Sequence, residues 1–530
     1  MNPLTELDQL NLEPAAKNQV AALLQALLDQ VAQDAKTIES KDLKIGALTY
    51  ELAYYKRIRF STQSEALTAL QRDVFEETFD TDIAAIEAEV EQLQDHSAST
   101  PATRPKRPRA GRQPLPPHLP RIEHRHEPEF CTCGQCGKDL VKIGEDVTEQ
   151  LDVEPAKFFV HRHIRPQYAC RTCETITAAP IPPAVIDGGM AAVGLLTWLL
   201  IGKFLDHLPL YRLEQIAARS GVILSRSTLA DWVGRLGVAL QPLADRLAWH
   251  LLQRDSVHAD ETPVSQLDPG NGKTKKAYLW AYRSNDLQPG PKIIVFDYQA
   301  GRSGRHAQNF LQDWHGHLLV DDYSGYKALF AAARAHPETQ FLLEPCVELA
   351  CWAHARRKFF DLYQANQSPI AQEALNRIAV IYAVEADARE LTAPERQALR
   401  AETSVPALTA LHAWLNQTRL RTAPNTATAK AIDYTLKRWP ALSRYAETGD
   451  LPIDNNPVEN AIRPIALGKK NWLFAGSERA GQRAAVIQTL LGTAKLNGLD
   501  PAAWLKETLE KLPTWPNSRI DELLPFRRLE

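Results

Sequence analysis

The sequence predicts a multidomain α+β protein in which a mixed α/β core follows several smaller units. Two patterns along the chain support this class. In residues 189–252, apolar residues recur at helical spacing, whereas from residue 256 they gather into short β-like runs between turn-rich segments. A chain of 530 residues is also long enough for about three or four domains.

The composition limits what the protein can do. Its net charge is −3, with 44% hydrophobic and 24% charged residues, so the molecule as a whole is not a polycation. Any nucleic-acid binding must therefore come from local basic patches. The longest apolar run, residues 191–201, has about half the length that spans a bilayer, and Met1–Leu10 has no apolar signal core. We expect a cytoplasmic protein with no membrane partner.

Residues 1–95 are predicted to be helical. Apolar residues recur every seven positions between residues 18 and 57, namely Leu24, Val31, Ile38, Ile45 and Leu52. This spacing fits a coiled coil, and it also fits an amphipathic helix packed on its own domain. A second helix, Asp82–Gln94, is acidic together with its flanks, which makes it a poor surface for DNA.

Residues 96–130 form a linker with recurring prolines and a basic cluster. The basic residues are Arg104, Lys106, Arg107, Arg109 and Arg112. Such a run is similar to arms that lie in an A·T-rich minor groove, where the negative potential is strongest. The alternative is a solvated linker without fixed structure.

Two Cys-x2-Cys pairs lie in residues 131–180. They are Cys133 with Cys136 and Cys170 with Cys173, with strand-like stretches at Phe158–His163 and Gln167–Cys170 between them. This arrangement is typical of a zinc ribbon, in which four thiolates hold one structural Zn²⁺ in a closed site. The alternative is four thiols without a metal. Cys131 offers a ligand that competes with Cys133.

Residues 181–252 are predicted to be helical and to contain a helix-turn-helix. Leu213–Arg219 and Ser225–Leu236 form the two helices, and Gly221 suits the sharp turn between them. Ser225 or Ser227 is placed to cap the second helix, and Arg226 and Ser227 would then face DNA. Helix pairs joined by glycine are also common outside DNA-binding proteins.

The core begins at residue 253, and its first part extends to residue 364. The predicted order is three strands, a helix and a fourth strand, at Ser256–Ala259, Ala277–Arg283, Lys292–Tyr298, Arg305–Trp314 and His317–Val320. This is the element order of an RNase H-like fold. A later strand, Cys346–Cys351, leads into a helix at His354–Tyr363.

Three acidic residues stand out at the ends of these elements. Asp260 and Asp321 follow the first and fourth strands, and Glu459 begins a later helix. Carboxylates brought together in this way suit two Mg²⁺ or Mn²⁺ ions that clamp a phosphodiester exchange. Each acid also has a structural interpretation: the aspartates can end a strand or start a turn, and Glu459 can complete a capping box or pair with Arg463.

The stretch between Asp321 and Glu459 is far longer than a compact core requires. We interpret residues 365–445 as a helical insertion, residues 446–510 as the catalytic helix with the rest of the core, and residues 511–530 as a tail. Basic residues predicted to bind phosphate flank the acids: His354, Arg356, Arg357, Lys358, Arg463, Lys469 and Lys470. Trp472 and Phe474 either stack on an unpaired base or belong to the core.

Four strings make a family resemblance specific. HADETPV, DDYSGY, CWAHARRKFF and DNNPVENAIRPIALGKKNWLFAGSERAG resemble the insertion-sequence-sixty-six family of DDE transposases, and the resemblance covers nearly the whole chain. It implies an RNase H-like core in which Asp260, Asp321 and Glu459 are the catalytic triad. The chain departs from the family at Asp322, where the family usually has glycine.

The resemblance implies a bacterial transposase that binds terminal inverted repeats and catalyses metal-dependent cleavage and strand transfer. Its partners would be double-stranded DNA of the element ends and the target, a second copy of the chain on DNA, and small accessory proteins from the same element. We expect it in the cytoplasm, with the nucleoid. The alternatives are a catalytically silent zinc-ribbon regulator and an RNase H-like nuclease that acts on branched DNA.

Overall fold

The computed structural model describes residues 140–154, 157–268, 273–331, 334–335, 342–343 and 345–526, together with shorter stretches and single residues between Val20 and Lys138. The basic arm at residues 104–112 lies outside this part of the chain, as do Cys131, Cys133, Cys136 and most of the second predicted helix. The described residues between 20 and 52 are all helical. Among them Leu48 is buried, whereas Leu27 and Ile38 are exposed.

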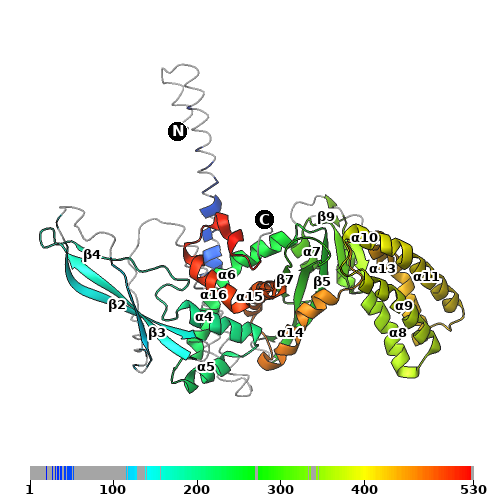
Figure 1. Ribbon diagram of the computed structural model, residues 1–530, viewed down its shortest axis with the longest axis horizontal. Helices are drawn as coiled ribbons and strands as arrows, with labels where there is room; N and C mark the ends of the chain where they lie inside the picture. Colours follow the sequence, from blue (N-terminus) through cyan, green and yellow to red (C-terminus); the bar gives the residue numbers. More distant parts are fainter. Residues whose placement is uncertain are drawn as a thin grey trace.

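A β-ribbon forms one end of the molecule (Figure 1). Its long strands β2 (Val141–Glu154) and β3 (Lys157–Ala169) are antiparallel, and β1 (Arg121–Arg125) and β4 (Ile176–Ala178) both pair with β3. The prediction of two separate strands in place of β3 was wrong. The pairing with β1 ends at Ile164 and the pairing with β4 begins at Gln167, so Pro166, which has no N–H, falls between these two partners.

The predicted helix pair around Gly221 is present. It consists of α5 (Leu210–Arg219) and α6 (Arg226–Leu251), preceded by α4 (Val193–Leu200) and a π-helical turn, η1 (Ile201–Leu205). Gly221 has φ of 73°, a conformation that suits glycine, and the Ser225 hydroxyl accepts the Thr228 N–H at 3.1 Å to cap α6. At 26 residues, however, α6 is much longer than the predicted helix.

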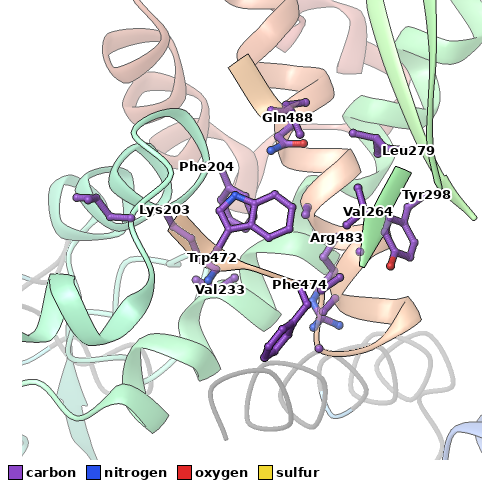
Figure 2. A pocket seen from close by; sticks show the side chains of 17 residues that line it. Lys203, Phe204, Val233, Val264, Leu279, Tyr298, Trp472, Phe474, Arg483 and Gln488 are labelled. Atoms are coloured by element: carbon purple, nitrogen blue, oxygen red, sulfur yellow. The ribbon is translucent and has the colours of Figure 1, made fainter. Parts of the chain in front are cut away.

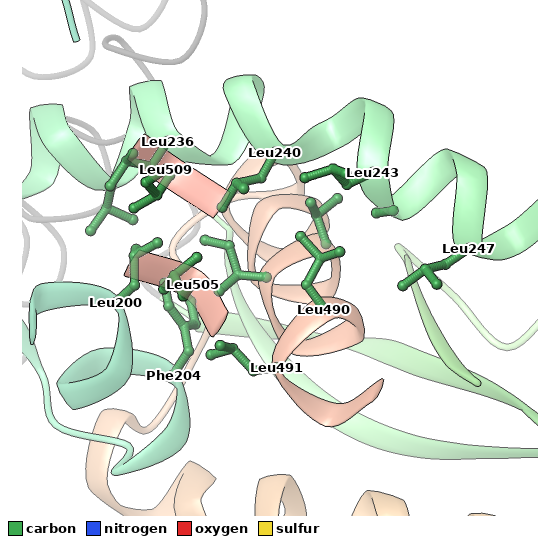
Figure 3. Close-up of a cluster of buried hydrophobic side chains, with 14 of the residues drawn as sticks. Leu200, Phe204, Leu236, Leu240, Leu243, Leu247, Leu490, Leu491, Leu505 and Leu509 are labelled. Atoms are coloured by element: carbon green, nitrogen blue, oxygen red, sulfur yellow. The ribbon is translucent and has the colours of Figure 1, made fainter. Parts of the chain in front are cut away.

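Helix α6 is buried along most of its length. Its leucines pack on those of α15 (Glu478–Leu496) and α16 (Pro501–Lys511), with Leu200 and Phe204 closing the cluster (Figure 3). The C-terminal 3-10 turns, Leu512–Thr514 and Asn517–Leu523, continue along the same region, where Arg246 donates to Asp521 at 2.8 Å. The described C-terminal segment, residues 478–526, is therefore part of the core around α6.

The central sheet has five strands in the order β11-β8-β5-β6-β7. Strands β5 (Ser256–Asp268), β6 (Lys273–Ser284) and β7 (Ile294–Gln299) form an antiparallel meander. Helix α7 (Gly304–Leu311) then returns the chain to β8 (His317–Val320), which is parallel to both β5 and β11 (Val347–Ala350). The predicted order of elements is confirmed.

Each face of this sheet is covered by helices. Val257, Ala259 and Trp280 pack in the cluster around α6, whereas Leu279, Ala281 and Phe296 pack on the opposite face against α14 (Asn456–Trp472) and α15. Side chains alternate along a strand, so His258 and Asp260 point to the α14 face. A 3-10 turn (Ser324–Phe330) and two short strands, β9 (Arg334–Ala335) and β10 (Leu342–Leu343), connect β8 to β11.

A helical insertion forms the other end of the molecule (Figure 1). After α8 (Trp352–Asn366) it comprises α9 (Pro369–Asp387), α10 (Ala393–Leu399), α11 (Val405–Leu420), α12 (Ala427–Lys437) and α13 (Trp439–Ser443), with a π-helical turn before α11 and a 3-10 turn at Arg444–Glu447. Its apolar core includes Leu319 of β8 and Leu349 of β11. The insertion therefore shares a core with one edge of the sheet.

Candidate active site

Two of the three predicted acids meet on neighbouring strands. Asp260 was predicted to follow its strand, but β5 continues to Asp268 because it pairs with β6 over this length, so Asp260 lies within β5, whereas Asp321 directly follows β8. The parallel register of β5 and β8 pairs His258 with Leu319, and two residues further along it brings Asp260 level with Asp321. Neighbouring strands lie about 4.8 Å apart, and both residues follow the alternation that points to the α14 face. The fold thus places the two carboxylates side by side.

The third acid comes from helix α14. Glu459 lies in the first turn of this helix, where backbone N–H groups favour negative charge. The negative charges of Asp321 and Glu459 both raise the pKa of Asp260, as expected for carboxylates that share one site. The three acids therefore converge from two strands and one helix.

Asp260 carries the strongest electrostatic signal of the site. Its pKa is raised to about 8, mainly by burial and then by the charge of Glu261, although the Glu261 N–H donates to Asp260 Oδ1 at 2.8 Å. A buried carboxylate among other acids is costly to ionise unless a cation compensates it. Carboxylate oxygens are the donors that Mg²⁺ and Mn²⁺ prefer, so these three acids fit the expected divalent ions.

Asn455, which the sequence analysis did not single out, fixes α14 against β5. Its side chain is fully buried; Oδ1 accepts from His258 Nδ1 at 2.9 Å, and Nδ2 donates to the Ala259 carbonyl at 2.9 Å. Its backbone N–H also donates to Cys351 Sγ at 3.2 Å. These contacts hold the start of the Glu459 helix beside Asp260. The only signal in the sequence was the Asp454-Asn455-Asn456-Pro457 string itself.

Asp322 points away from the other acids. Its side chain is exposed and contacts Arg438, which is contributed by the insertion. Asp321, in contrast, accepts the Tyr323 N–H at 2.8 Å and interacts electrostatically with Asp260. Asp321 therefore faces the acid cluster, whereas Asp322 faces away from it.

Glu261 belongs to the opposite face of the sheet. Its carboxylate accepts from Tyr326 Oη at 2.8 Å and from Arg302 Nε at 2.7 Å, and its side chain is almost wholly buried. Both oxygens already accept hydrogen bonds. Glu261 therefore stabilises the packing on the α6 face of the sheet and is not part of the acid cluster on the α14 face. Successive side chains of a strand point to opposite faces, and this alternation in the sequence distinguishes Glu261 from Asp260.

The predicted phosphate-binding residues fall into three groups. Arg356, Arg357 and Lys358 on α8, and Arg463 and Lys470 on α14, are exposed. Lys469 donates to the Pro263 carbonyl at 2.9 Å and so ties α14 to β5. His354 is half-buried and turns its Nδ1 towards Glu459, 3.8 Å from Oε1.

Trp472 and Phe474 lie at the far end of α14 from Glu459. They line an apolar pocket together with Phe204 and Val233 (Figure 2), and Phe474 is buried. With a rise of about 1.5 Å per residue, Trp472 stands roughly 20 Å along the helix from Glu459. For Phe474 this placement favours the core interpretation over stacking on a base at the site.

Two further predicted residues lie in the N-terminal half of the described chain. Arg226 is half-buried and pairs with Glu214 of α5 at 3.2 Å, which offsets part of its charge. Cys170 and Cys173 stand on one tight turn after β3, where the Cys170 N–H donates to the Thr175 carbonyl at 3.0 Å and Glu174 has φ of 53°. Two thiols on one such turn fit half of a zinc site.

The zinc ligands can be separated by metal content. We expect Cys133→Ser, Cys136→Ser, Cys170→Ser and Cys173→Ser each to lose the bound Zn²⁺, because a closed structural site uses all four thiolates. Cys131→Ser should keep one Zn²⁺ per chain. Elemental analysis of the purified variants measures this directly. If Cys131→Ser lost its zinc while Cys133→Ser retained it, Cys131 would be the ligand in place of Cys133.

Four family models match successive parts of the chain. Residues 188–483 match the model described as Transposase IS66 family, and residues 131–174 match the zinc-finger binding domain of transposase IS66. Residues 489–526 match the IS66 C-terminal element, and residues 47–123 match the model described as Transposase C of IS166 homeodomain.

Full-length relatives are similar over nearly the whole chain. The uncharacterized proteins y4jD and y4qI of Sinorhizobium fredii (strain NBRC 101917 / NGR234) are 36% and 38% identical to it. The first alignment covers 94% of this chain and 97% of the relative, and the second covers 95% and 93%. In the described part of the chain, no helix is long and apolar enough to cross a membrane.

Proposed function

Since the chain belongs to the IS66 transposase family, we propose that it cleaves and joins DNA at the ends of a bacterial insertion sequence, with Asp260, Asp321 and Glu459 as its catalytic carboxylates. The observation that carries this proposal is the convergence of the three acids from β5, β8 and α14. Burial raises the pKa of Asp260 most, and the charges of Asp321 and Glu459 raise it further, so the ionised site calls for a compensating cation.

We assign the core to the RNase H-like class. An antiparallel meander followed by a helix and two parallel strands, in the order β11-β8-β5-β6-β7, supports this assignment. Within this scheme residues 253–364 and 446–510 form the catalytic core and residues 365–445 form the insertion. Residues 131–180 form the zinc ribbon.

We assign a separate role in catalysis to the three acids and to Asn455. When bound, two divalent ions would lower the pKa of the attacking hydroxyl and stabilise charge on the leaving oxygen. Asp260, Asp321 and Glu459 would hold these ions through carboxylate oxygens. Asn455 fixes the relative position of two of the three acids. Water would attack first and free a 3′-hydroxyl, and that hydroxyl would then attack the target strand, without a covalent protein–DNA intermediate.

The exposed basic residues of α8 and α14 give the site a phosphate-binding rim. Both helices begin beside the acids, so Arg356, Arg357, Lys358 and Arg463 would contact the DNA backbone near the scissile bond. Lys470, roughly 16 Å along α14 from Glu459, would contact the backbone farther from that bond. The basic arm and the zinc ribbon would recognise the inverted repeats. A dimer would pair two ends on DNA, and small accessory proteins from the same element would complete the assembly.

Cleavage of the element's own ends tests the proposed function. With Mg²⁺ or Mn²⁺ and the accessory proteins supplied, we expect the wild type to cut, and Asp321→Ala and Glu459→Ala to bind the ends without cutting. Asp322→Ala is the matched control: its side chain faces Arg438, so it should retain cleavage within about threefold, the scale of a surface substitution. Wild-type binding without any cleavage would instead support a silent regulator.

A further inference from the structure

Two buried polar atoms face each other at the rim of the acid cluster. His354 Nδ1 and Glu459 Oε1 are 3.8 Å apart, which is too far for a hydrogen bond. Within the described part of the chain, neither atom has a hydrogen-bond partner, although both are shielded from solvent. Buried polar atoms are nearly always bonded, so a pair left open in this way indicates a missing ligand.

The spacing of this pair suits a metal ion. Nitrogen and oxygen ligands lie about 2.0–2.2 Å from a first-row divalent ion, which places adjacent ligand atoms about 3 to 3.5 Å apart. The separation in the structure is slightly larger and closes with a small side-chain rotation. His354 lies in the first turn of α8 and Glu459 in the first turn of α14, so two helix starts hold the pair.

Cys351 is the third potential ligand near this pair but is unsuited to the role. Its Sγ lies within 4.8 Å of the ligand atoms of His354 and Glu459. However, it already accepts the Asn455 N–H at 3.2 Å. Mg²⁺ and Mn²⁺ are also hard ions, which disfavour a soft sulfur ligand. Cys351 therefore positions Asn455, and the imidazole is left as the partner of Glu459.

We propose that His354 is a fourth ligand of the active-site metals, with Nδ1 and Glu459 Oε1 holding one divalent ion on the α14 side of the cluster. This inference rests on the proposed function, because it assumes metal at the three acids. It replaces the phosphate-binding role predicted for His354: Nδ1 faces Glu459, whereas the neighbouring Arg356 and Arg357 are exposed.

An imidazole ligand has a consequence for metal choice. Nitrogen donors favour Mn²⁺ and the later divalent ions over Mg²⁺, which prefers oxygen. We therefore expect His354→Ala to weaken Mn²⁺ binding about tenfold or more, and Mg²⁺ binding less. Loss of an outer-shell partner alone typically costs a factor of ten or more, so loss of a ligand should cost at least as much.

The test measures metal binding to the full chain, with its zinc in place and without DNA. Mn²⁺ titrations followed by electron paramagnetic resonance give the affinity, and pulsed measurements detect nitrogen bound to the ion. We expect a ¹⁴N coupling in the wild type and in His412→Ala, a remote histidine stacked on Trp439. The coupling should vanish in both His354→Ala and His354→Asn, and circular dichroism checks that these variants are folded.

The outcomes separate this inference from the proposed function. Unchanged Mn²⁺ affinity in both His354 variants, or a wild type without nitrogen coupling, would overturn the ligand role even if the enzyme cuts DNA. Conversely, nitrogen coupling that depends on His354 would support the ligand role even in a protein that never cuts its ends.

Discussion

Asp260→Asn is expected to reduce strand cleavage by about a thousandfold or more while leaving end binding intact. A metal-bound carboxylate contributes several kcal/mol to stabilising charge in the transition state, and each 1.4 kcal/mol is a factor of about ten in rate. The asparagine has the same shape and keeps an oxygen for the Glu261 N–H. Single-turnover cleavage, measured beside a binding assay, tests this.

Although Asp260→Asn lowers activity, it should raise the stability of the fold relative to the wild type as the pH rises, when no divalent ion is added. The folded protein keeps a proton on Asp260 up to about pH 8, whereas the unfolded chain loses it near the ordinary pKa of 3.8. Raising the pH through this window therefore removes stability from the wild type. The substituted asparagine cannot ionise, so the variant should gain stability relative to the wild type as the pH rises from about 5 to about 8.5.

Urea unfolding at the two pH values measures this difference. Subtracting the variant from the wild type isolates Asp260 from other titrating groups such as Asp297 and Asp454, whose pKa values are also raised by burial. Added Mg²⁺ should then stabilise the wild type and not Asp260→Asn, because a ligand stabilises only the state that binds it. A pH-independent difference would contradict the electrostatic account of the site.

Asn455→Ala is expected to have the largest effect on stability among the substitutions near the site. It removes the partners of His258 Nδ1 and of the Ala259 carbonyl, both inside the protein. Each buried polar group left unsatisfied costs about 1–3 kcal/mol, so the free energy of unfolding should fall by about 2–5 kcal/mol. Cleavage should also fall, because α14 loses its attachment beside Asp260.

Asn456→Ala is the matched control for this experiment. The neighbouring asparagine is exposed, and among the described residues its side chain donates only to Asp454, at 2.8 Å. Its removal should change the free energy of unfolding by about 0.5 kcal/mol or less. Chemical denaturation of both variants gives the comparison. Equal destabilisation by the two changes would show that the buried contacts of Asn455 do not hold the helix.

The order of the core was predictable because it depends on local patterns. Alternating apolar residues and turn residues located the strands, and the positions of Asp260 on β5 and of Asp321 after β8 followed from them, although β5 continues past Asp260 to Asp268. Side-chain alternation also favoured Asp321 over Asp322. These signals lie within a few residues of the positions they describe, so one sequence contains them.

The contacts that complete the site were not predictable in this way. These contacts join segments that are distant in the sequence, so they form only in the folded chain. They are the contacts of Asn455 with His258, of Arg438 with Asp322 and of His354 with Glu459. Likewise, the length of α6 exceeded the prediction because tertiary packing on α15 and α16 stabilises it. No local pattern encodes partners that lie a hundred or more residues apart.

The packing of α15 and α16 on α6 also determines when the protein can fold during synthesis. Strands β5 to β8 leave the ribosome well before the helices that cover them, so the nascent chain carries an apolar sheet face and a bare α6 for much of its translation. Incomplete chains of this kind are prone to aggregate. Copies of the gene that are truncated before residue 478 should therefore yield insoluble protein rather than a stable fragment that competes with the intact chain for DNA.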